Sequence, residues 1–247
     1  MKKHRIFFIA IFFCIACNSN TSSNSNDASG ENTGNDKDSP TNAVGCNIMP
    51  LFREGTVIEG RSTDAKGVET SSQLSTVTKV SSENGRTIAE VKMKPANEDD
   101  KSLVATYICD GKNLLMDMTS LFAGYEKNGV TLKGDPILFP LQVTEGETLP
   151  DASYSFTTAK AGKAMTIITH LKNRKVEGKE TIHTPAGDFD CFRITTDTEA
   201  ESKMEGMNPK MQEMMDAMKA NMPRQKYVMW FAPAVGIVKV SMYSNDQ

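Results

Sequence analysis

The sequence lacks an apolar run long enough to span a bilayer as a helix. Its longest run, Ile6 to Ala16, has eleven residues, whereas a transmembrane helix needs about twenty. A short basic segment, Met1 to Arg5, precedes this run, and that order is typical of a secretory signal peptide. We therefore expect an exported chain whose mature part spans no membrane.

Recognisable catalytic motifs are also missing. The sequence contains no HExxH, GxSxG, Walker A or GxGxxG pattern. Only two histidines, His170 and His183, follow the signal segment. A thiol nucleophile needs a base, usually histidine, and Cys191 could in principle use either one. A core or paired cysteine with two surface histidines is the favoured interpretation, so we predict no enzymatic activity and no cofactor.

Basic residues are too few for a nucleic-acid-binding protein. Removal of Lys2, Lys3 and Arg5 with the signal leaves 25 of the 28 basic residues against 31 acidic ones, a formal charge of −6. Nucleic-acid binding needs a basic footprint. We therefore expect no nucleic-acid partner.

The apolar run ends in a sequence typical of bacterial lipoproteins. Cys17 follows Ala16 directly, and a small residue before a cysteine is the lipobox pattern, although Cys14 stands where leucine is usual. An ordinary signal peptide with a chance cysteine is the alternative. We predict that residues 1–16 are removed and that the lipid on Cys17 attaches the chain to the membrane. The first acidic residue after Cys17 is Asp27. This absence of acidic residues directly after the lipidated cysteine favours an outer-membrane lipoprotein whose domain faces the periplasm.

A polar tether and one domain follow the lipidated cysteine. Residues 17–45 consist largely of Asn, Ser, Thr, Gly and Asp, a composition that cannot bury enough surface to fold. The remaining 202 residues, 46–247, are enough for one domain with a substantial core. Three cysteines lie in that domain.

The domain is predicted to be mainly β. Alternating or β-branched runs are separated by turn sequences such as Asn84-Gly85 and Asp110-Gly111. The spacing favours an antiparallel meander that forms a curved or partly closed sheet. The predicted strands are 56–62, 70–80, 87–93, 103–108, 113–117, 130–133, 137–139, 164–176, 180–183, 189–198, 227–231 and 237–243.

One segment predicts a short amphipathic helix instead. It begins at Asn208-Pro209, an N-cap followed by proline at the first helical position, and ends before Pro223. Its methionines fall on one face of a 3.6-residue period; they are Met211, Met214, Met215, Met218 and Met222. Such a face is commonly ordinary core, but it also suits apolar ligands and, through the thioethers, Cu(I).

Several motifs resemble those of the TapB-like family of secreted bacterial proteins. They are Cys46 with Pro50 and 54–56, Gly146 with 149–152, 173–181, 184–187, 189–192, and 230–239. Ala234 stands where that family usually has glycine. The resemblance covers the whole domain and implies a β-rich extracytoplasmic domain. It implies no reaction, and it implies that the three cysteines recur without assigning them a role.

The state of these cysteines stays open between one disulfide and buried free thiols. Three cysteines allow one bridge, whose partners the spacing does not decide. Cys109 and Cys191 are the predicted pair because both lie beside or inside predicted strands. Cys46, next to the tether, is then the free one.

These observations favour a lipid-anchored envelope protein that binds an apolar ligand or another envelope protein at an apolar surface or groove under the methionine helix. A Cu(I)-binding protein that uses the methionine stripe is the alternative. No His or Cys lies near the stripe to complete a mixed site, so no metal site is predicted. A hydrolase with an unrecognised site is a weaker alternative.

The lipidation of Cys17 is directly testable. Metabolic labelling with a clickable fatty acid should tag the wild-type protein and not Cys17→Ser, because the thiol of Cys17 is the acceptor. Equal labelling of the two proteins would refute the assignment.

Overall fold

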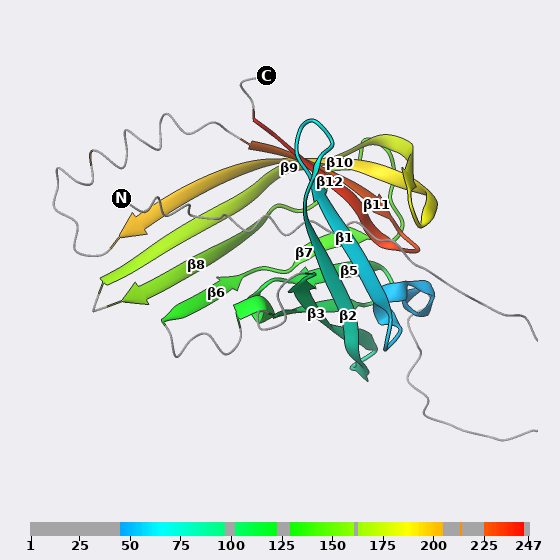
Figure 1. Ribbon diagram of the computed structural model, residues 1–247, viewed down its shortest axis with the longest axis horizontal. Coiled ribbons are helices and arrows are strands. Elements are labelled where there is room, and N and C mark those ends of the chain that lie inside the picture. Colours follow the sequence, from blue (N-terminus) through cyan, green and yellow to red (C-terminus); the bar gives the residue numbers. More distant parts are fainter. Residues whose placement is uncertain are drawn as a thin grey trace, which may run out of the picture.

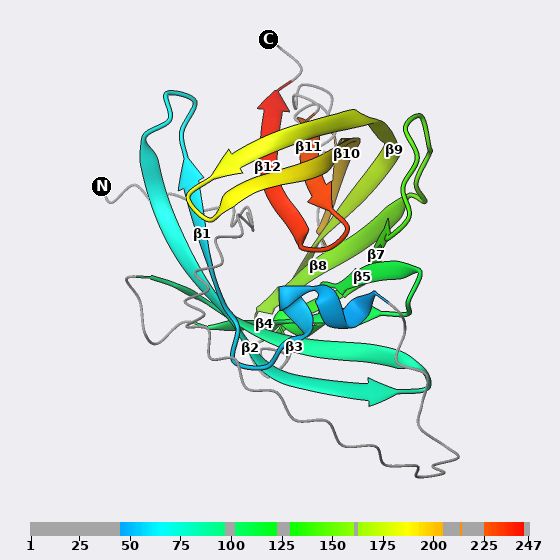
Figure 2. The same cartoon turned by 90° about the vertical axis from the view of Figure 1, so that its right-hand side faces the viewer.

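The computed structural model describes residues 45–96, 102–122, 129–160, 163–204, 213 and 225–244. Within these residues the chain forms twelve strands and three short 3-10 helices, η1 (Cys46–Ile48), η2 (Pro50–Phe52) and η3 (Thr119–Phe122). All strand pairs are antiparallel and make two six-stranded sheets (Figures 1 and 2). The prediction of a mainly β, antiparallel domain is therefore confirmed.

The N-terminal sheet is nearly a simple meander. Its order is β1 (Val57–Thr63), β2 (Glu69–Glu83), β3 (Arg86–Pro95), β4 (Leu103–Cys109), β5 (Asn113–Asp117) and β7 (Ile137–Pro140). Between β2 and β3, Asn84 and Gly85 have positive φ angles of 50° and 75°. Two such residues in succession suit the tight turn of a two-residue hairpin, which confirms the predicted hairpin.

The C-terminal sheet has longer strands and curls strongly (Figure 2). Its order is β12 (Gly236–Ser244), β11 (Gln225–Ala232), β10 (Gly187–Met204), β9 (Lys163–Thr184), β8 (Ala152–Lys160) and β6 (Val130–Gly134). Strands β9 and β10 form one long hairpin. Strand β8 is absent from the predicted set. Its sequence is rich in Ser, Thr and Ala, with Tyr154 and Phe156 as its large apolar side chains, so its hydrophobic alternation is weak.

The predicted single sheet is wrong, because the meander is interrupted between β6 and β7. Only Asp135 and Pro136 separate these strands, yet β6 pairs with β8 and β7 pairs with β5. The two strands therefore belong to different sheets. Alternation along a strand shows that one face is buried but not which neighbour it pairs with, so the sequence pattern could not reveal this exchange.

The core lies between the facing sides of the two sheets. Phe139 of β7 stacks on Phe231 of β11 with ring centroids 5.3 Å apart. Buried side chains from nearly every strand join this cluster, including Ile58, Val91 and Leu114 from the N-terminal sheet. A second, smaller cluster lies on the other face of the C-terminal sheet, where the end of the β9–β10 hairpin meets β11 and β12; it contains Ile182, Cys191, Val228, Trp230, Ala232 and Val238.

The predicted Cys109–Cys191 disulfide is wrong. Cys46 pairs with Cys109, and Cys191 is a buried free thiol. The reason is the position of the two clusters, since Cys46 and Cys109 belong to the main core and Cys191 belongs to the second cluster on the opposite face. Although it adjoins the tether in sequence, Cys46 is only 1% exposed and ties η1 to the end of β4.

The predicted signal segment, tether and methionine helix lie outside the described residues, except for Gly45 and Glu213. Glu213 is helical and exposed. Within the described part of the chain, no helix has the length and apolar character needed to cross a membrane.

Loss of the disulfide should destabilise the domain. Cys46 and Cys109 are 63 residues apart, and the chain-entropy model gives about 4 kcal/mol for a loop of that length. Urea unfolding of the Cys46→Ala, Cys109→Ala double variant should show a loss of this order. A reducing agent should lower the stability of the wild type and leave the double variant unchanged. Detection of Cys191 in a bridge by non-reducing peptide mapping would contradict the assignment.

Candidate functional site

The two faces of strand β9 carry different side chains, as its alternation predicts. Ile167 lies opposite Phe156 of β8 and Ser202 of β10, and Met165 lies opposite Thr158 and Met204. Directly paired residues share a face of an antiparallel sheet. This face is the one that, further along the same strands, carries the core residues Leu171 and Ala152.

We call the outlying part of this face the inner wall. It consists of Val130, Leu132, Phe156, Thr158, Met165, Ile167, Ala200, Ser202 and Met204. Ala200 is exposed and the other side chains are partly exposed. In Figure 1, strands β8, β9 and β10 extend to the left beyond the N-terminal sheet. The inner wall is therefore a largely apolar surface next to the core but not part of it.

The opposite face of the same strands is polar. Lys172 pairs with Glu199 at 2.8 Å, and the hydroxyls of Thr157 and Thr166 are 2.9 Å apart. Ile168, His170 and Glu201 lie on the same outer face. This far half of the sheet is thus amphipathic, with its apolar side turned toward the concave face.

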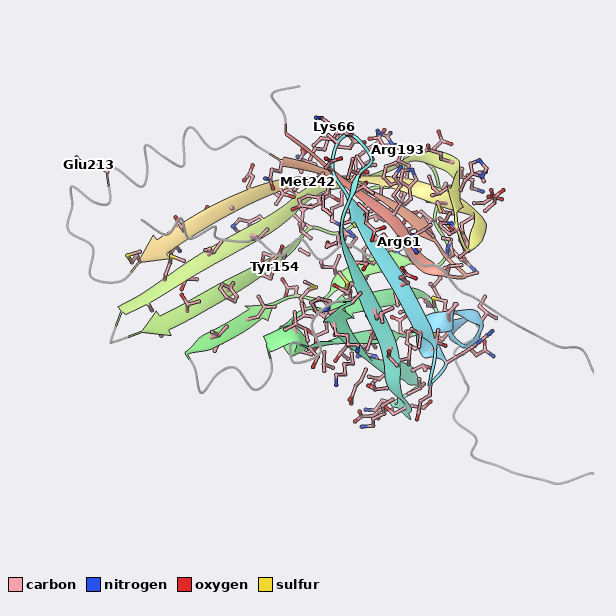
Figure 3. All side chains as sticks on the ribbon, in the orientation of Figure 1. Arg61, Lys66, Tyr154, Arg193, Glu213 and Met242 are labelled. Atoms are coloured by element: carbon pink, nitrogen blue, oxygen red, sulfur yellow. A yellow bond between two sulfur atoms is a disulfide. The ribbon has the colours of Figure 1, made fainter. Side chains whose placement is uncertain are left out.

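Hydroxyl groups form a belt between the inner wall and the core. This hydroxyl belt has five members: Tyr154, Thr169, Thr196, Thr198 and Tyr227. Thr169 lies opposite Tyr154, Thr196 lies opposite Tyr227, and Thr198 lies opposite the core residue Leu171. Figure 3 shows Tyr154 on β8. Burial raises the pKa of the Tyr154 phenol, and its hydrogen bond with Thr169 opposes that rise. Burial also raises the pKa of Tyr227, with a smaller contribution from Tyr154. Both phenols are therefore neutral donors at physiological pH.

A β-bulge places Arg174 on this inner face. Asn173 has a φ of 51°, and the pairing of β9 with β10 shifts between Thr195 and Asp197. In a regular strand, residues 171 and 174 would face opposite sides. The extra residue reverses the alternation, so that both Leu171 and Arg174 are buried.

Arg174 joins the two sheets from inside the core. Its Nη1 donates to the carbonyl of Pro150 at 2.7 Å, and its Nη2 donates to the carbonyl of Leu138 in β7 at 2.9 Å. Its guanidinium carbon lies 5.2 Å from the ring centre of Phe139. Burial lowers the pKa of Arg174 to about 10, against an opposing effect of Asp151. The side chain therefore stays charged at neutral pH while it is fully buried.

Three buried polar atoms in this region have no hydrogen-bond partner within the described residues. They are Nε of Arg174, Oγ1 of Thr196 and Oγ1 of Thr198. All three side chains are on the inner face, and Thr196 is opposite the bulge that contains Arg174. Buried polar atoms are nearly always hydrogen-bonded in folded proteins. This cluster is therefore the clearest chemical feature of the inner face.

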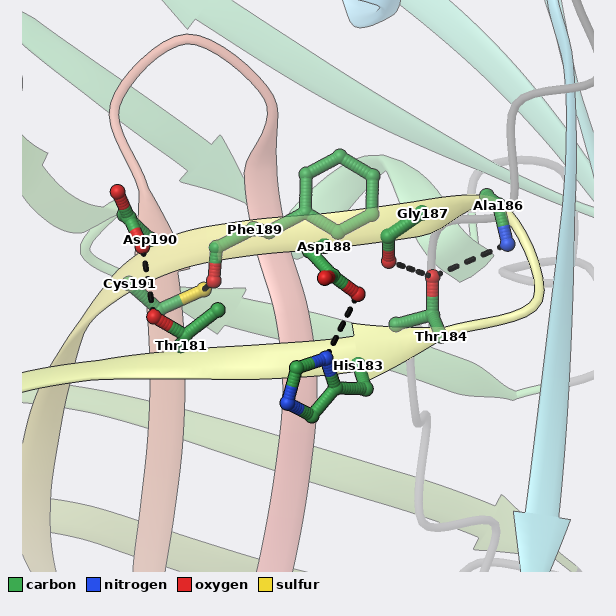
Figure 4. A network of polar contacts seen from close by, with 9 residues as sticks. All are labelled: Thr181, His183, Thr184, Ala186, Gly187, Asp188, Phe189, Asp190 and Cys191. Carbon is green, nitrogen blue, oxygen red and sulfur yellow. Dashed lines mark hydrogen bonds and ion pairs between the residues drawn. The ribbon is translucent and has the colours of Figure 1, made fainter.

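The end of the β9–β10 hairpin separates the residues considered for a thiol nucleophile. His183 pairs with Asp188 at 2.7 Å, whereas Cys191 lies opposite Glu180 and donates to the carbonyl of Phe189 (Figure 4). The alternation of the paired strands puts Cys191 and His183 on opposite faces. Burial raises the pKa of the Cys191 thiol to about 11. This geometry favours the core interpretation of Cys191.

Trp230 is the centre of the second cluster. Its Nε1 donates to Glu180 at 2.7 Å, and Nζ of Lys239 lies 4.5 Å from the centre of its ring. Segments 189–192 and 230–239, two of the motifs that carry the TapB-like resemblance, therefore meet here. Their contacts hold the end of the hairpin against β11 and β12. The arrangement is structural packing rather than an open site, because Trp230 is 5% exposed.

The predicted site residues Met211, Met214, Met215, Met218 and Met222 and the lipidation site Cys17 lie outside the described residues. Within the described part of the chain, no group of three or more His, Cys, Asp or Glu side chains could hold a metal ion. Sequence reasoning missed Arg174 and the threonines of the hydroxyl belt. The available signal was Asn173-Arg174 inside an otherwise alternating β run, since asparagine tolerates the positive φ of a bulge.

The chain is similar to known proteins in sequence and in fold. A family model described as DUF3108-like matches residues 53–247. A protein from Bacteroides fragilis, described as exported and as having a YmcC-like fold, superimposes with a TM-score of 0.56 at 20% identity over 78% of this chain and 90% of its own. A Parabacteroides distasonis protein described as a lipoprotein gives 0.55 at 18% identity over 81% and 92%. No curated protein matches the chain in sequence.

Arg174 should be important for stability. In Arg174→Met, the partly buried carbonyls of Leu138 and Pro150 lose their donors, and an unsatisfied group costs up to about 1–3 kcal/mol when it is buried. Removal of a desolvated charge offsets part of this cost. We expect a net loss of about 2–4 kcal/mol in urea unfolding.

Lys175→Met is the matched control for this change. Lys175 is half exposed, and its contact with Glu177 is 4.0 Å, so its loss should cost under about 1 kcal/mol. Equal stability of the Arg174→Met variant and the wild type would show that the buried guanidinium does not hold the sheets together.

Proposed function

The chain belongs to the DUF3108-like family, and on this premise we propose that it is a non-enzymatic, lipid-anchored envelope protein that binds an apolar molecule on the inner wall. The observation that carries the proposal is the amphipathic far half of the C-terminal sheet. Its outer face is charged, while its inner face presents Phe156, Met165 and Ile167 outside the core cluster.

An apolar surface of this kind is costly for a protein in water unless something covers it for part of the time. Scattered exposed apolar residues need no explanation. The inner wall is different because its apolar side chains are contiguous across β6, β8, β9 and β10. Binding of an apolar ligand, or of the apolar part of another envelope protein, would remove this surface from water.

The proposed location follows from the anchor and from the similar structures. One solved structure with this fold is described as exported and another as a lipoprotein. Together with the lipobox at Cys17, this supports an envelope protein. We propose that the lipid inserts in the outer membrane and that the domain faces the periplasm. The TapB-like resemblance stays a prediction within the wider family.

The experiment measures binding of the uncharged fluorescent probe N-phenyl-1-naphthylamine to residues 18–247. This chain contains both sheets, the core and the disulfide. Ile167→Glu should reduce affinity for the probe by at least about tenfold, because an unpaired charge is placed on the apolar surface.

Ile168→Glu is the matched control, since the adjacent side chain lies on the outer face. It should bind the probe as the wild type does. Trp230, which is the one tryptophan and lies in the second cluster, reports folding of both variants by its fluorescence. Unchanged probe binding by a folded Ile167→Glu variant, or absence of binding by the wild type, would refute the proposed function.

A further inference from the structure

We infer that the inner wall binds an amphiphile with an anionic oxygen headgroup, which lies against Arg174, Thr196 and Thr198 while its apolar chain runs along the wall. The inference rests on the proposed function and adds the chemical class of the ligand. It stands on the position of the buried polar cluster, on the charge of Arg174 and on the change in burial along β10.

The polar cluster lies at one end of the apolar rows. From Thr198, β10 continues past Ala200 and Ser202 to Met204 on the same face. Six residues of strand cover about 20 Å at about 3.3 Å per residue. This is the order of length of an extended long acyl chain. One ligand can therefore contact the polar cluster and the apolar rows at the same time.

Arg174 is a buried cation whose described hydrogen bonds are to carbonyl groups. Nη1 and Nη2 donate to Pro150 and Leu138, and Nε has no partner among the described residues. Asp151 acts on the guanidinium through its charge, with no hydrogen bond to it among the described contacts. A buried charge is costly unless an opposite charge or several hydrogen bonds compensate it. An anionic oxygen next to Nε would supply both.

The threonines provide further donors for the same headgroup. A hydroxyl donates one hydrogen and accepts with its lone pairs, so Oγ1 of Thr196 and Oγ1 of Thr198 can each donate to a carboxylate or phosphate oxygen. Hydrogen bonds to an ionised group are stronger than those between neutral groups. A cationic headgroup is excluded by the guanidinium charge, and a neutral alcohol gains no charge compensation.

Burial changes in the order that such a ligand requires. Along the inner face of β10, Met204 and Ser202 are partly exposed, Ala200 is exposed, Thr198 is partly exposed, and Thr196 is fully buried like Arg174. A headgroup that moves along this strand from the open end meets Thr198 before Thr196. Tyr154 and Tyr227 of the hydroxyl belt flank this approach with neutral phenols.

The test is displacement of N-phenyl-1-naphthylamine from residues 18–247 by four surfactants with the same twelve-carbon chain. These are dodecanoate, dodecyl phosphate, 1-dodecanol and dodecyltrimethylammonium. At least one anion should displace the probe at a concentration lower by about tenfold or more than that of the alcohol. The cation should be the weakest competitor. The carboxylate and phosphate arms distinguish a fatty acid from a phosphorylated lipid as the source of the headgroup.

The double variant Thr196→Val, Thr198→Val removes both hydroxyls at nearly constant volume and leaves Arg174 in place. With each competitor measured relative to the variant's own affinity for the probe, its preference for anion over alcohol should fall to about threefold or less. Thr157→Val, Thr166→Val is the matched control on the outer face and should keep the full preference.

The remaining outcomes overturn one claim or the other. Equal displacement by anion and alcohol, with normal probe binding, would refute the headgroup inference and leave the proposed function intact. The polar cluster would then bind buried water alone. An undiminished anion preference in the double variant would refute the role of the two threonines. Failure of the wild type to bind the probe and all four surfactants would refute the proposed function itself.

Discussion

The architecture depends on one buried guanidinium. Arg174 donates to carbonyls at Leu138 and Pro150 and covers the ring of Phe139, which itself stacks on Phe231. The chain segment before β8 runs along β9 on the same side, where Leu149 N donates to the carbonyl of Arg174 at 2.8 Å. One side chain therefore connects the edge strand of the N-terminal sheet, the connection between the sheets and the middle of the longest hairpin. Its position requires the bulge at Asn173, because a regular strand would turn residue 174 outward.

Two register shifts explain how one strand pair can serve three environments. On the hairpin side of the bulge, Val176 and Ile194 face the main core; a second shift, between Arg193 and Ile194, turns Ile182 to the opposite face, where it joins Cys191 in the second cluster. On the other side, the same inner face passes from core to hydroxyl belt to inner wall. At the opposite end of the main core, Cys46 is 1% exposed, and its disulfide with Cys109 holds η1 to β4. The inner wall thus extends from a rigid support, which suits a binding surface that must keep its shape.

Local features of this fold could be predicted from the sequence, and non-local ones could not. The Asn84-Gly85 turn and the alternation of Met165, Ile167 and Thr169 are encoded within a few residues, and both appear in the structure. The exchange of β6 and β7 between sheets and the pairing of Cys46 depend on contacts between distant segments. Strand β8 has weak alternation because its inner residues include the small Ala152 and the polar Thr158. The inner wall could not be predicted either, since alternation indicates that one face of a strand is buried but does not identify the segments that cover it.

The arrangement of polarity on the inner face argues for a ligand rather than for packing alone. A face that only completes a core gains most from aliphatic residues in well-defined rotamers, and the main core is built in that way around Val91, Leu114 and Ile194. The belt instead places threonine and tyrosine hydroxyls beside a charged side chain, at the boundary where the core ends and the exposed rows begin. Buried hydroxyls without partners weaken a core. Their position at one end of an apolar surface, rather than scattered through the interior, is the arrangement that recognises a molecule with one polar end and one apolar chain.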